Sequence, residues 1–187
     1  MSGRGSGLAA LGRDPWRKLR GPGGRNMLNA LLFQLGWFAC VLGGSTVAKV
    51  FLPLYLVVHF TWISAAPREW RFTALVVLLG VTLDVIAVSA GVFTVEAGGV
   101  LPFWLVALWV LFATLLPHGL SWLQGRPWLA AVAGAAGGTL SYVAGVRLGV
   151  AEATCLPLAV GWWAIQWALL LPSLLLVVPQ TAGTRSA

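Results

Sequence analysis

The chain has 187 residues, of which 59% are hydrophobic and 9% are charged. Soluble globular domains carry roughly 25% charged residues, so this composition excludes an ordinary soluble domain and predicts one integral membrane domain. The net charge of +7 suggests a nucleic-acid partner only until the basic residues are located. Six of the twelve precede the first apolar segment, where membrane proteins carry cytoplasmic positive charge. We therefore expect no nucleic-acid partner.

Residues 1–26 are rich in glycine, arginine and proline and lack apolar periodicity. This composition predicts a disordered basic tail in the cytoplasm. Met27 opens the first apolar segment and is an alternative start of the protein. A cleaved signal peptide is the rival interpretation, but further apolar segments follow at once and no small-x-small cleavage site is found. We expect the first helix to be retained.

Six apolar segments predict an all-α, polytopic transmembrane bundle of about six helices. They comprise residues 27–44, 46–64, 72–92, 101–123, 127–149 and 155–178. The membrane domain then spans residues 27–178, and residues 179–187 form a short cytoplasmic tail. Because the first two segments are short and separated by three residues, a re-entrant hairpin is the alternative.

The basic residues predict the orientation of these helices. With alternating connections, ten basic residues fall on the side of the N-terminal tail, and only Lys49 and Arg147 fall on the other. Loops rich in Lys and Arg stay in the cytoplasm. We expect both termini to be cytoplasmic.

Eleven tryptophans fit the same arrangement. Five fall at expected helix ends, where amphipathic rings prefer to lie: Trp62, Trp70, Trp104, Trp122 and Trp128. Trp37, Trp109 and Trp167 fall deeper in the membrane. These three either pack in the core or line a pocket for a hydrophobic ligand.

Small residues form stripes on the first and fifth segments. Stripes of this kind let two helix backbones approach closely. The stripes are Gly36, Cys40 and Gly44, and Gly134, Gly138, Ser141, Gly145 and Gly149. We expect the fifth helix to be the packing centre of the bundle.

Asp84 is the carboxylate inside the third segment. A charge facing lipid at the bilayer centre costs at least about 2.5 kcal/mol, so Asp84 must face protein, pair with a cation or be protonated. Tyr142 and Ser141 on the fifth segment lie at about the same depth in the membrane as Asp84. Lys49 and Arg147 are the candidate cations to pair with it. Two roles of Asp84 remain open: it forms a structural ion pair, or it is a functional carboxylate that binds protons or substrate.

A second polar layer is expected nearer the cytoplasm. It comprises His118, His59 and Gln34, with Gln166 on the sixth segment between the two layers. Because histidine titrates near neutral pH, this layer can relay protons or bind an anionic head group. Satisfied histidines at the membrane interface are the alternative.

Signatures of catalysis and metal binding are missing from the sequence. It has two histidines without a His-Glu-x-x-His motif, and no Cys-x-x-Cys motif, so we expect no metal site, no cofactor and no catalytic residue. Cys40 and Cys155 both fall near the expected outer face. A disulfide between them requires Cα atoms within about 7 Å.

Several stretches resemble an uncharacterised bacterial family of small, tryptophan-rich inner-membrane proteins of unknown function. They are residues 27–44, Glu69-Trp70, Asp84, residues 109–114 through His118, and residues 142–149. The family pattern has asparagine before the histidine and serine after the aspartate, where this chain has Pro117 and Val85. The resemblance implies a bacterial inner membrane and operation beside enzymes that modify membrane lipids.

Three functions are compatible with these observations. The first is a small transporter, or a protein that binds an amphiphile or lipid in a polar cavity lined by Asp84, Lys49 and His118. The second is an accessory or scaffold subunit that holds a lipid-modifying enzyme or further copies of itself. The third is an intramembrane enzyme, although we lean against one.

Overall fold

The computed structural model describes residues 21–64, 68–96 and 101–179. Within these ranges it has five α-helices, which confirms the all-α fold class: α2 (Pro22–Val58), α3 (Glu69–Ser89), α4 (Phe103–Leu115), α5 (Pro127–Arg147) and α6 (Leu156–Val177). The short elements are the π-helix η1 (His59–Ile63), the 3₁₀ helix η2 (Ser121–Leu123), and the strands β1 (Phe93–Thr94) and β2 (Glu152–Ala153). Most of the expected N-terminal tail lies outside the described residues. The expected C-terminal tail also lies outside them, except for its first residue.

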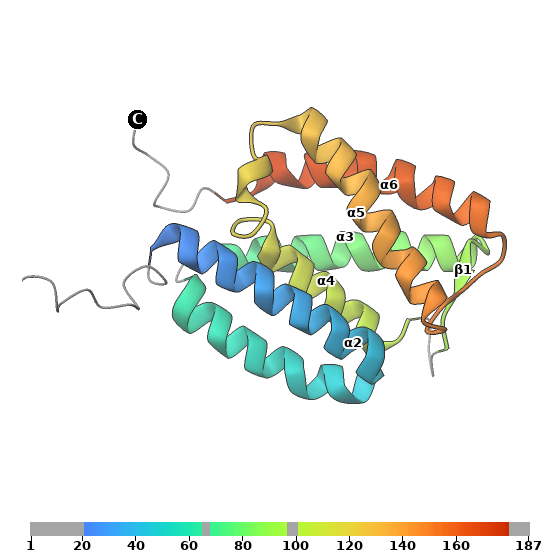
Figure 1. Ribbon diagram of the computed structural model, residues 1–187, viewed down its shortest axis with the longest axis horizontal. Coiled ribbons are helices and arrows are strands. Elements are labelled where there is room, and N and C mark those ends of the chain that lie inside the picture. Colours follow the sequence, from blue (N-terminus) through green and yellow to red (C-terminus); the bar gives the residue numbers. More distant parts are fainter. Residues whose placement is uncertain (1–20, 65–67, 97–100, 180–187) are drawn as a thin grey trace, which may run out of the picture.

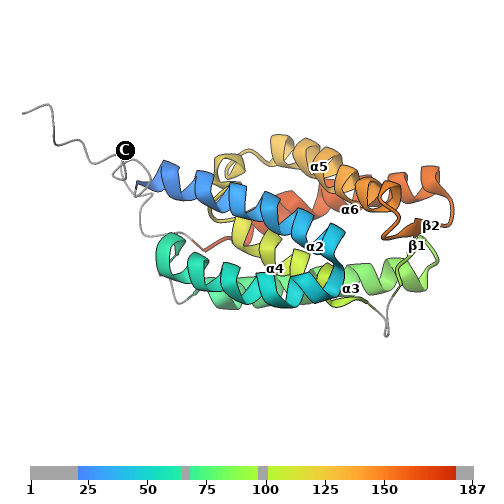
Figure 2. The same cartoon turned by 60° about the horizontal axis from the view of Figure 1, so that its bottom comes forward.

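The prediction of six helices is wrong, because the first two expected segments belong to one sharply bent helix, α2. Only Gly44 inside it leaves the helical conformation, with φ 60° and ψ −160°, a combination essentially reserved for glycine. The two arms of α2 on either side of Gly44 run antiparallel, in blue and cyan-green (Figure 1; Figure 2). The hydrogen bond from Asn29 Nδ2 to Tyr55 Oη, 3.2 Å long, joins the arms near their far ends.

Four helices are long and apolar enough to cross a membrane, judged by length and composition: α2 with η1, α3, α5 and α6. The shorter α4 is apolar on all sides and largely buried, as expected of a helix surrounded by protein. It packs against both α2 and α3. The packing centre is therefore α4 and not α5.

The fourth helix is shorter than expected, 13 residues instead of an apolar segment of 23. Proline at position 117 lacks the amide proton that would continue the helical hydrogen bonds. The chain accordingly leaves α4 after Leu115, turns, and forms η2 before α5 begins at Pro127. This early exit places His118 in a turn inside the protein, where it is 6% exposed.

The small-residue stripe of α5 is shared between two environments. A Cβ built on Gly134 or Gly138 would overlap with Trp167 of α6, so these two glycines carry the close packing of α5 on α6. Ser141 and Gly145 line a cavity, and Gly134 and Gly138 also belong to its wall. On α2, a Cβ at Gly36 would overlap with Leu111 of α4.

The bundle has two distinct ends, visible in Figures 1 and 2. We call the end where α2 begins and α6 finishes the terminal end. The opposite end is the β end, where β1 and β2 pair antiparallel with Phe93 opposite Ala153 and Thr94 opposite Glu152. This small ladder fastens the segment after α3 to the connection between α5 and α6.

We expect Gly44→Ala to destabilise the protein by about 1–3 kcal/mol, because alanine is strained at this backbone conformation. Its Cβ would meet no atom within 4 Å, so the strain is conformational and not steric. Reversible unfolding in detergent micelles measures the effect. Gly161→Ala is the matched control, since that Cβ also meets nothing but the backbone is helical. Equal stability of Gly44→Ala and the wild type would contradict the assignment of the bend.

We expect Gly134→Ala to destabilise the protein on the order of 1–3 kcal/mol, the usual range for overpacking. The added Cβ would lie 2.4 Å from the backbone oxygen of Trp167, which cannot rotate away. Gly137→Ala, three residues further along the same helix, is the control. Its added Cβ meets no atom within 4 Å, so the stability of this variant should equal or slightly exceed that of the wild type. The same unfolding assay compares the two variants, and equal losses would contradict this packing.

Candidate functional site: an aromatic cavity and two buried polar clusters

A cavity of about 440 Å³ lies between the first arm of α2, α4, α5 and α6. Its size falls within the range of roughly 300–1,000 Å³ typical of small-molecule sites. It forms because α5 packs mainly on α6 while α2 packs mainly on α4, so the two helix pairs enclose space where they face one another. The glycines of α5 supply no side chain to fill that space.

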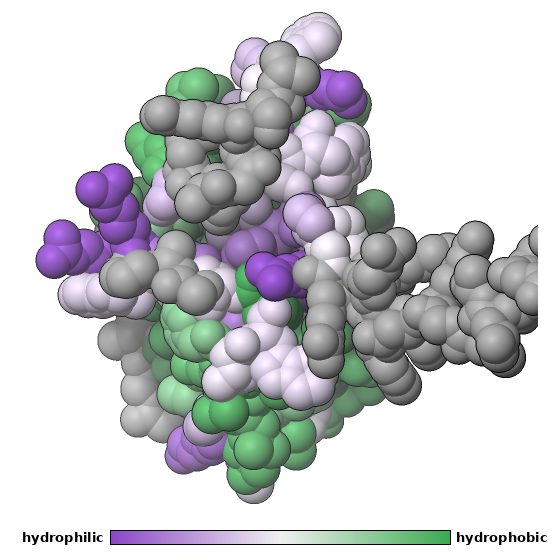
Figure 3. Space-filling view, turned by 90° about the vertical axis from the view of Figure 1, so that its left-hand side faces the viewer, coloured by the Kyte–Doolittle hydropathy of each residue, from purple (hydrophilic) through white to green (hydrophobic). Residues whose placement is uncertain are grey.

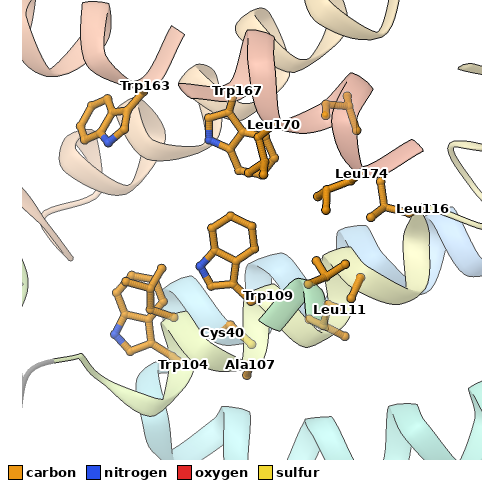
Figure 4. Close-up of a cluster of buried hydrophobic side chains, with 14 of the residues drawn as sticks. Cys40, Trp104, Ala107, Trp109, Leu111, Leu116, Trp163, Trp167, Leu170 and Leu174 are labelled. Carbon is orange, nitrogen blue, oxygen red and sulfur yellow. The ribbon is translucent and has the colours of Figure 1, made fainter. Parts of the chain in front are cut away.

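Five tryptophans line the cavity: Trp37, Trp104, Trp109, Trp122 and Trp167. They include all three that the sequence places deep in the membrane. Trp109 and Trp167 face each other from α4 and α6 (Figure 4), stacked at 5.4 Å between centroids with a 6° interplanar angle. Packing and pocket lining were treated as alternatives for these rings, and the structure combines them.

The cavity opens between the first arm of α2 and α5. The lining residues that are exposed lie on these two helices and on η2: Gln34, Trp122, Gly137 and Leu140. A hydrogen bond from Trp37 Nε1 to Ser141 Oγ, 2.8 Å long, crosses from α2 to α5. Gln34 thus belongs to the cavity and not to the histidine layer.

Asp84 is buried behind the cavity wall, with 1% of its surface exposed. Its Oδ2 accepts a hydrogen bond from Trp109 Nε1 at 2.6 Å, and its Oδ1 accepts one from Tyr142 Oη at 2.5 Å. Gly80, one turn earlier on the same face, leaves room for the Trp109 ring, which a Cβ there would overlap. The face of α3 that carries Gly80 and Asp84 thus packs against α4.

Neither of the two expected cations forms an ion pair with Asp84. Lys49, five residues beyond the bend at Gly44, and Arg147, the last residue of α5, are both exposed. Within the described ranges, the ion pairs are those of Glu69 with His59 and His118. Tyr142 is thus the expected neighbour that Asp84 contacts, whereas Ser141 bonds to Trp37.

A second buried group, which we call the histidine cluster, comprises His59, Glu69 and His118. Glu69 Oε1 lies 2.6 Å from His59 Nε2 and 3.1 Å from His118 Nε2. The Ser64 hydroxyl donates to the other carboxylate oxygen. The cluster joins three elements, since His59 opens the π-helix η1, Glu69 opens α3 and His118 follows α4. π-Helical turns occur frequently at functional sites.

A chain of hydrogen bonds indicates which nitrogen of the neutral His59 ring carries the proton. Thr114 Oγ1 donates to the Leu111 carbonyl at 2.8 Å, so it accepts from Tyr55 Oη at 2.6 Å. Tyr55 Oη in turn accepts from Asn29 Nδ2, whose second hydrogen faces His59 Nδ1 at 3.4 Å. With Nδ1 accepting, the His59 proton is on Nε2, which donates to Glu69.

Sequence reasoning missed Glu69, Asn29 and Tyr55 as site residues. Glu69 sits in a short basic connection, where it was read only as part of a family motif. Two signals were available: it is the acidic residue between two apolar segments, and carboxylates are favoured in the first turn of a helix. Asn29, fully buried, and Tyr55, 2% exposed, lie in the apolar α2 arms and carried no motif.

The remaining predicted site residues lie apart from both clusters. Gln166 accepts a hydrogen bond from Trp162 Nε1 at 2.9 Å on α6 and does not join the two polar layers. The two cysteines considered for a disulfide are not paired: Cys40 is a buried free thiol on α2, and Cys155 is an exposed free thiol before α6. Cys40 packs in the core, where its neighbours are apolar side chains (Figure 4).

Four helices able to span a membrane, judged by length and composition, and the apolar α4 packed among them define a multi-pass helical membrane protein. The chain belongs to the family described as protein of unknown function (DUF2878), whose model matches residues 26–173. This match covers most of the chain and confirms the resemblance to an uncharacterised family. No curated protein and no solved structure was found to match the chain.

We expect Asp84→Leu to destabilise the protein, because it leaves Trp109 Nε1 and Tyr142 Oη buried without their acceptor. Each unsatisfied buried group costs on the order of 1–3 kcal/mol. Asp84→Asn should cost clearly less, since its Oδ1 can accept from the indole while its Nδ2 donates to the phenol oxygen. Unfolding in detergent measures both variants. Equal losses for Leu and Asn would show that these hydrogen bonds are not the role of Asp84.

Proposed function

We propose that this protein binds one amphiphile, a molecule with an apolar chain and a polar end, in the cavity between α2, α4, α5 and α6. The observation that carries the proposal is the cavity of about 440 Å³ with five tryptophans in its wall. Burying a hydrocarbon chain there contributes roughly 0.8 kcal/mol for each CH₂ group. Transport of such a molecule across or along the membrane, or its storage, is the role that this site supports best.

Gln34 is the polar side chain at the exposed rim of the cavity. Its amide carries both donors and an acceptor, so it can bind the polar end of the ligand.

The position of the opening favours access from the side. Gly137 and Leu140 on α5 and Gln34 on α2 are exposed along the flank of the bundle. In a bilayer this flank would face lipid. An amphiphile already dissolved in the membrane could then enter without passing through water.

We infer further that the protein lies in the bacterial inner membrane with the terminal end in the cytoplasm. Four exposed arginines at or near that end support this orientation: Arg25, Arg68, Arg71 and Arg126. Figure 3 looks onto this end, where hydrophilic side chains lie among apolar ones. The β end carries Lys49 and Arg147 with Glu96 and Glu152, so the basic excess is at the terminal end.

Association with lipid-modifying enzymes remains a prediction from the family resemblance, and association with further copies of the chain remains a prediction from the sequence. The cavity is compatible with such a role, because a lipid bound here could be presented to an enzyme. Comparing the lipid profiles of cells with and without the gene tests this wider hypothesis, and unchanged lipids would contradict it.

We expect the purified protein to bind 9,10-dibromostearic acid, whose bromines quench the tryptophans of the cavity wall. Gly137→Phe should weaken this binding by at least about tenfold, because each 1.4 kcal/mol lost is a factor of ten. The substitution is sterically permitted: a Cβ on Gly137 meets no atom within 4 Å and extends from a residue in the cavity wall.

Gly161→Phe is the matched control, since Gly161 is also exposed and free of close neighbours but is not part of the cavity wall. It should bind the probe as the wild type does. Saturable quenching that Gly137→Phe leaves unchanged would place the amphiphile elsewhere, and no saturable quenching of the wild type would contradict the proposed function.

A further inference from the structure

We propose that the histidine cluster binds one divalent first-row metal ion, of the zinc type, through His59 Nε2, His118 Nε2 and the Glu69 carboxylate. This site is separate from the amphiphile cavity, whose wall contains none of the three residues. All three are buried, at 0%, 6% and 1% exposure for His59, His118 and Glu69. The proposal therefore does not depend on the proposed function.

The ligand atoms are close to the spacing that such an ion requires. One atom from each residue lies within 4.8 Å of the others, and Glu69 Oε1 is 2.6 and 3.1 Å from the two imidazole nitrogens. Ligand bonds of about 2.0–2.2 Å in tetrahedral geometry separate ligand atoms by roughly 3.3 Å. Each imidazole nitrogen must move away from Glu69 Oε1 by less than about 1 Å to reach this spacing.

The charge of the cluster also favours a cation. Glu69 is a buried carboxylate, and among the described residues no lysine or arginine forms an ion pair with it. While both imidazoles are neutral, the charge of this carboxylate is not compensated, and removing such a charge from water costs several kcal/mol. A divalent cation neutralises the carboxylate and leaves both imidazoles neutral, which is the form in which histidine binds metal.

The ligands are of the appropriate kind and are held in place. Two histidines and one carboxylate form a familiar three-ligand set for zinc that leaves a fourth position open. The same set serves other first-row ions such as Fe²⁺. The Ser64 hydroxyl holds the carboxylate, and Tyr55 stacks on the His59 ring at 5.8 Å between centroids. The His118 side chain, 8% exposed, is the most exposed of the three ligands.

Metal binding through Nε2 requires the ring proton of each histidine to be on Nδ1, and at His59 this changes the hydrogen bonds. The proton on His59 Nδ1 needs an acceptor. A half-turn of the Asn29 amide presents Oδ1 to this proton in place of Nδ2. The amide then gives up its 3.3 Å hydrogen bond from the Gly119 backbone nitrogen and its 3.2 Å hydrogen bond to Tyr55 Oη.

Titration of the chelator-treated, detergent-purified full chain with Co²⁺ tests the proposal. Visible d–d absorption should saturate at one Co²⁺ per chain and disappear when Zn²⁺ is added. Zn²⁺ should also raise the melting temperature in a concentration-dependent way, because an ion that binds only the folded state stabilises it. Absence of both signals at millimolar metal would overturn the proposal. This experiment uses the wild-type chain, so its outcome does not depend on whether a variant folds.

Variants then locate the ion. Glu69→Gln and His118→Asn should each weaken Co²⁺ binding by at least about tenfold. Asp84→Asn is the matched control, because Asp84 is the other buried carboxylate of α3 and has no histidine beside it. It should bind Co²⁺ as the wild type does. Unchanged binding in Glu69→Gln, or an equal loss in Asp84→Asn, would overturn the assignment of the site.

Discussion

Asp84 accepts hydrogen bonds from Trp109 and Tyr142, and these two bonds join α3 to α4 and to α5. The rest of the bundle depends on this contact, because α5 and α6 otherwise pack mainly on each other. In an apolar surrounding, a buried carboxylate and two buried donors have no water to turn to. Their mutual satisfaction fixes the depth and rotation of three helices at once, and with them the position of the Trp109 ring beside Trp167.

The cavity follows from the same constraint. The α5–α6 pair is held at the Asp84 contact, at the Trp37–Ser141 hydrogen bond and at the β1–β2 ladder. Between these points the glycine face of α5 confronts α4 and the first arm of α2 without large side chains of its own. Aromatic rings from the other helices line the gap but do not close it. A membrane protein of this size thus contains an apolar site open to its flank, where a lipid-like molecule is the natural occupant.

The histidine cluster shows a different use of burial. There a carboxylate meets two imidazoles near the terminal end, and a run of hydrogen bonds through Asn29, Tyr55 and Thr114 orients one ring. Such connected networks rigidify the surrounding helices, because every member is satisfied only in one arrangement. The network and the cavity use different faces of α4: Thr114 points to the network, and Phe112 and Leu115 point to the cavity.

The sequence by itself determined the membrane class, the all-α fold and the place of Asp84 inside an apolar helix. These properties depend on apolar length and on periodicity within one segment, which are local. Only the tertiary structure decided that one bent helix replaces the first two segments and that Glu69 joins the two histidines. It also decided that Lys49 and Arg147 do not pair with Asp84 and that the two cysteines do not pair with each other. Contacts between helices depend on relative rotation and depth, and many packings share the same apolar pattern. Residues 59, 69 and 118 meet because three helix ends converge, and no spacing along the chain records that convergence.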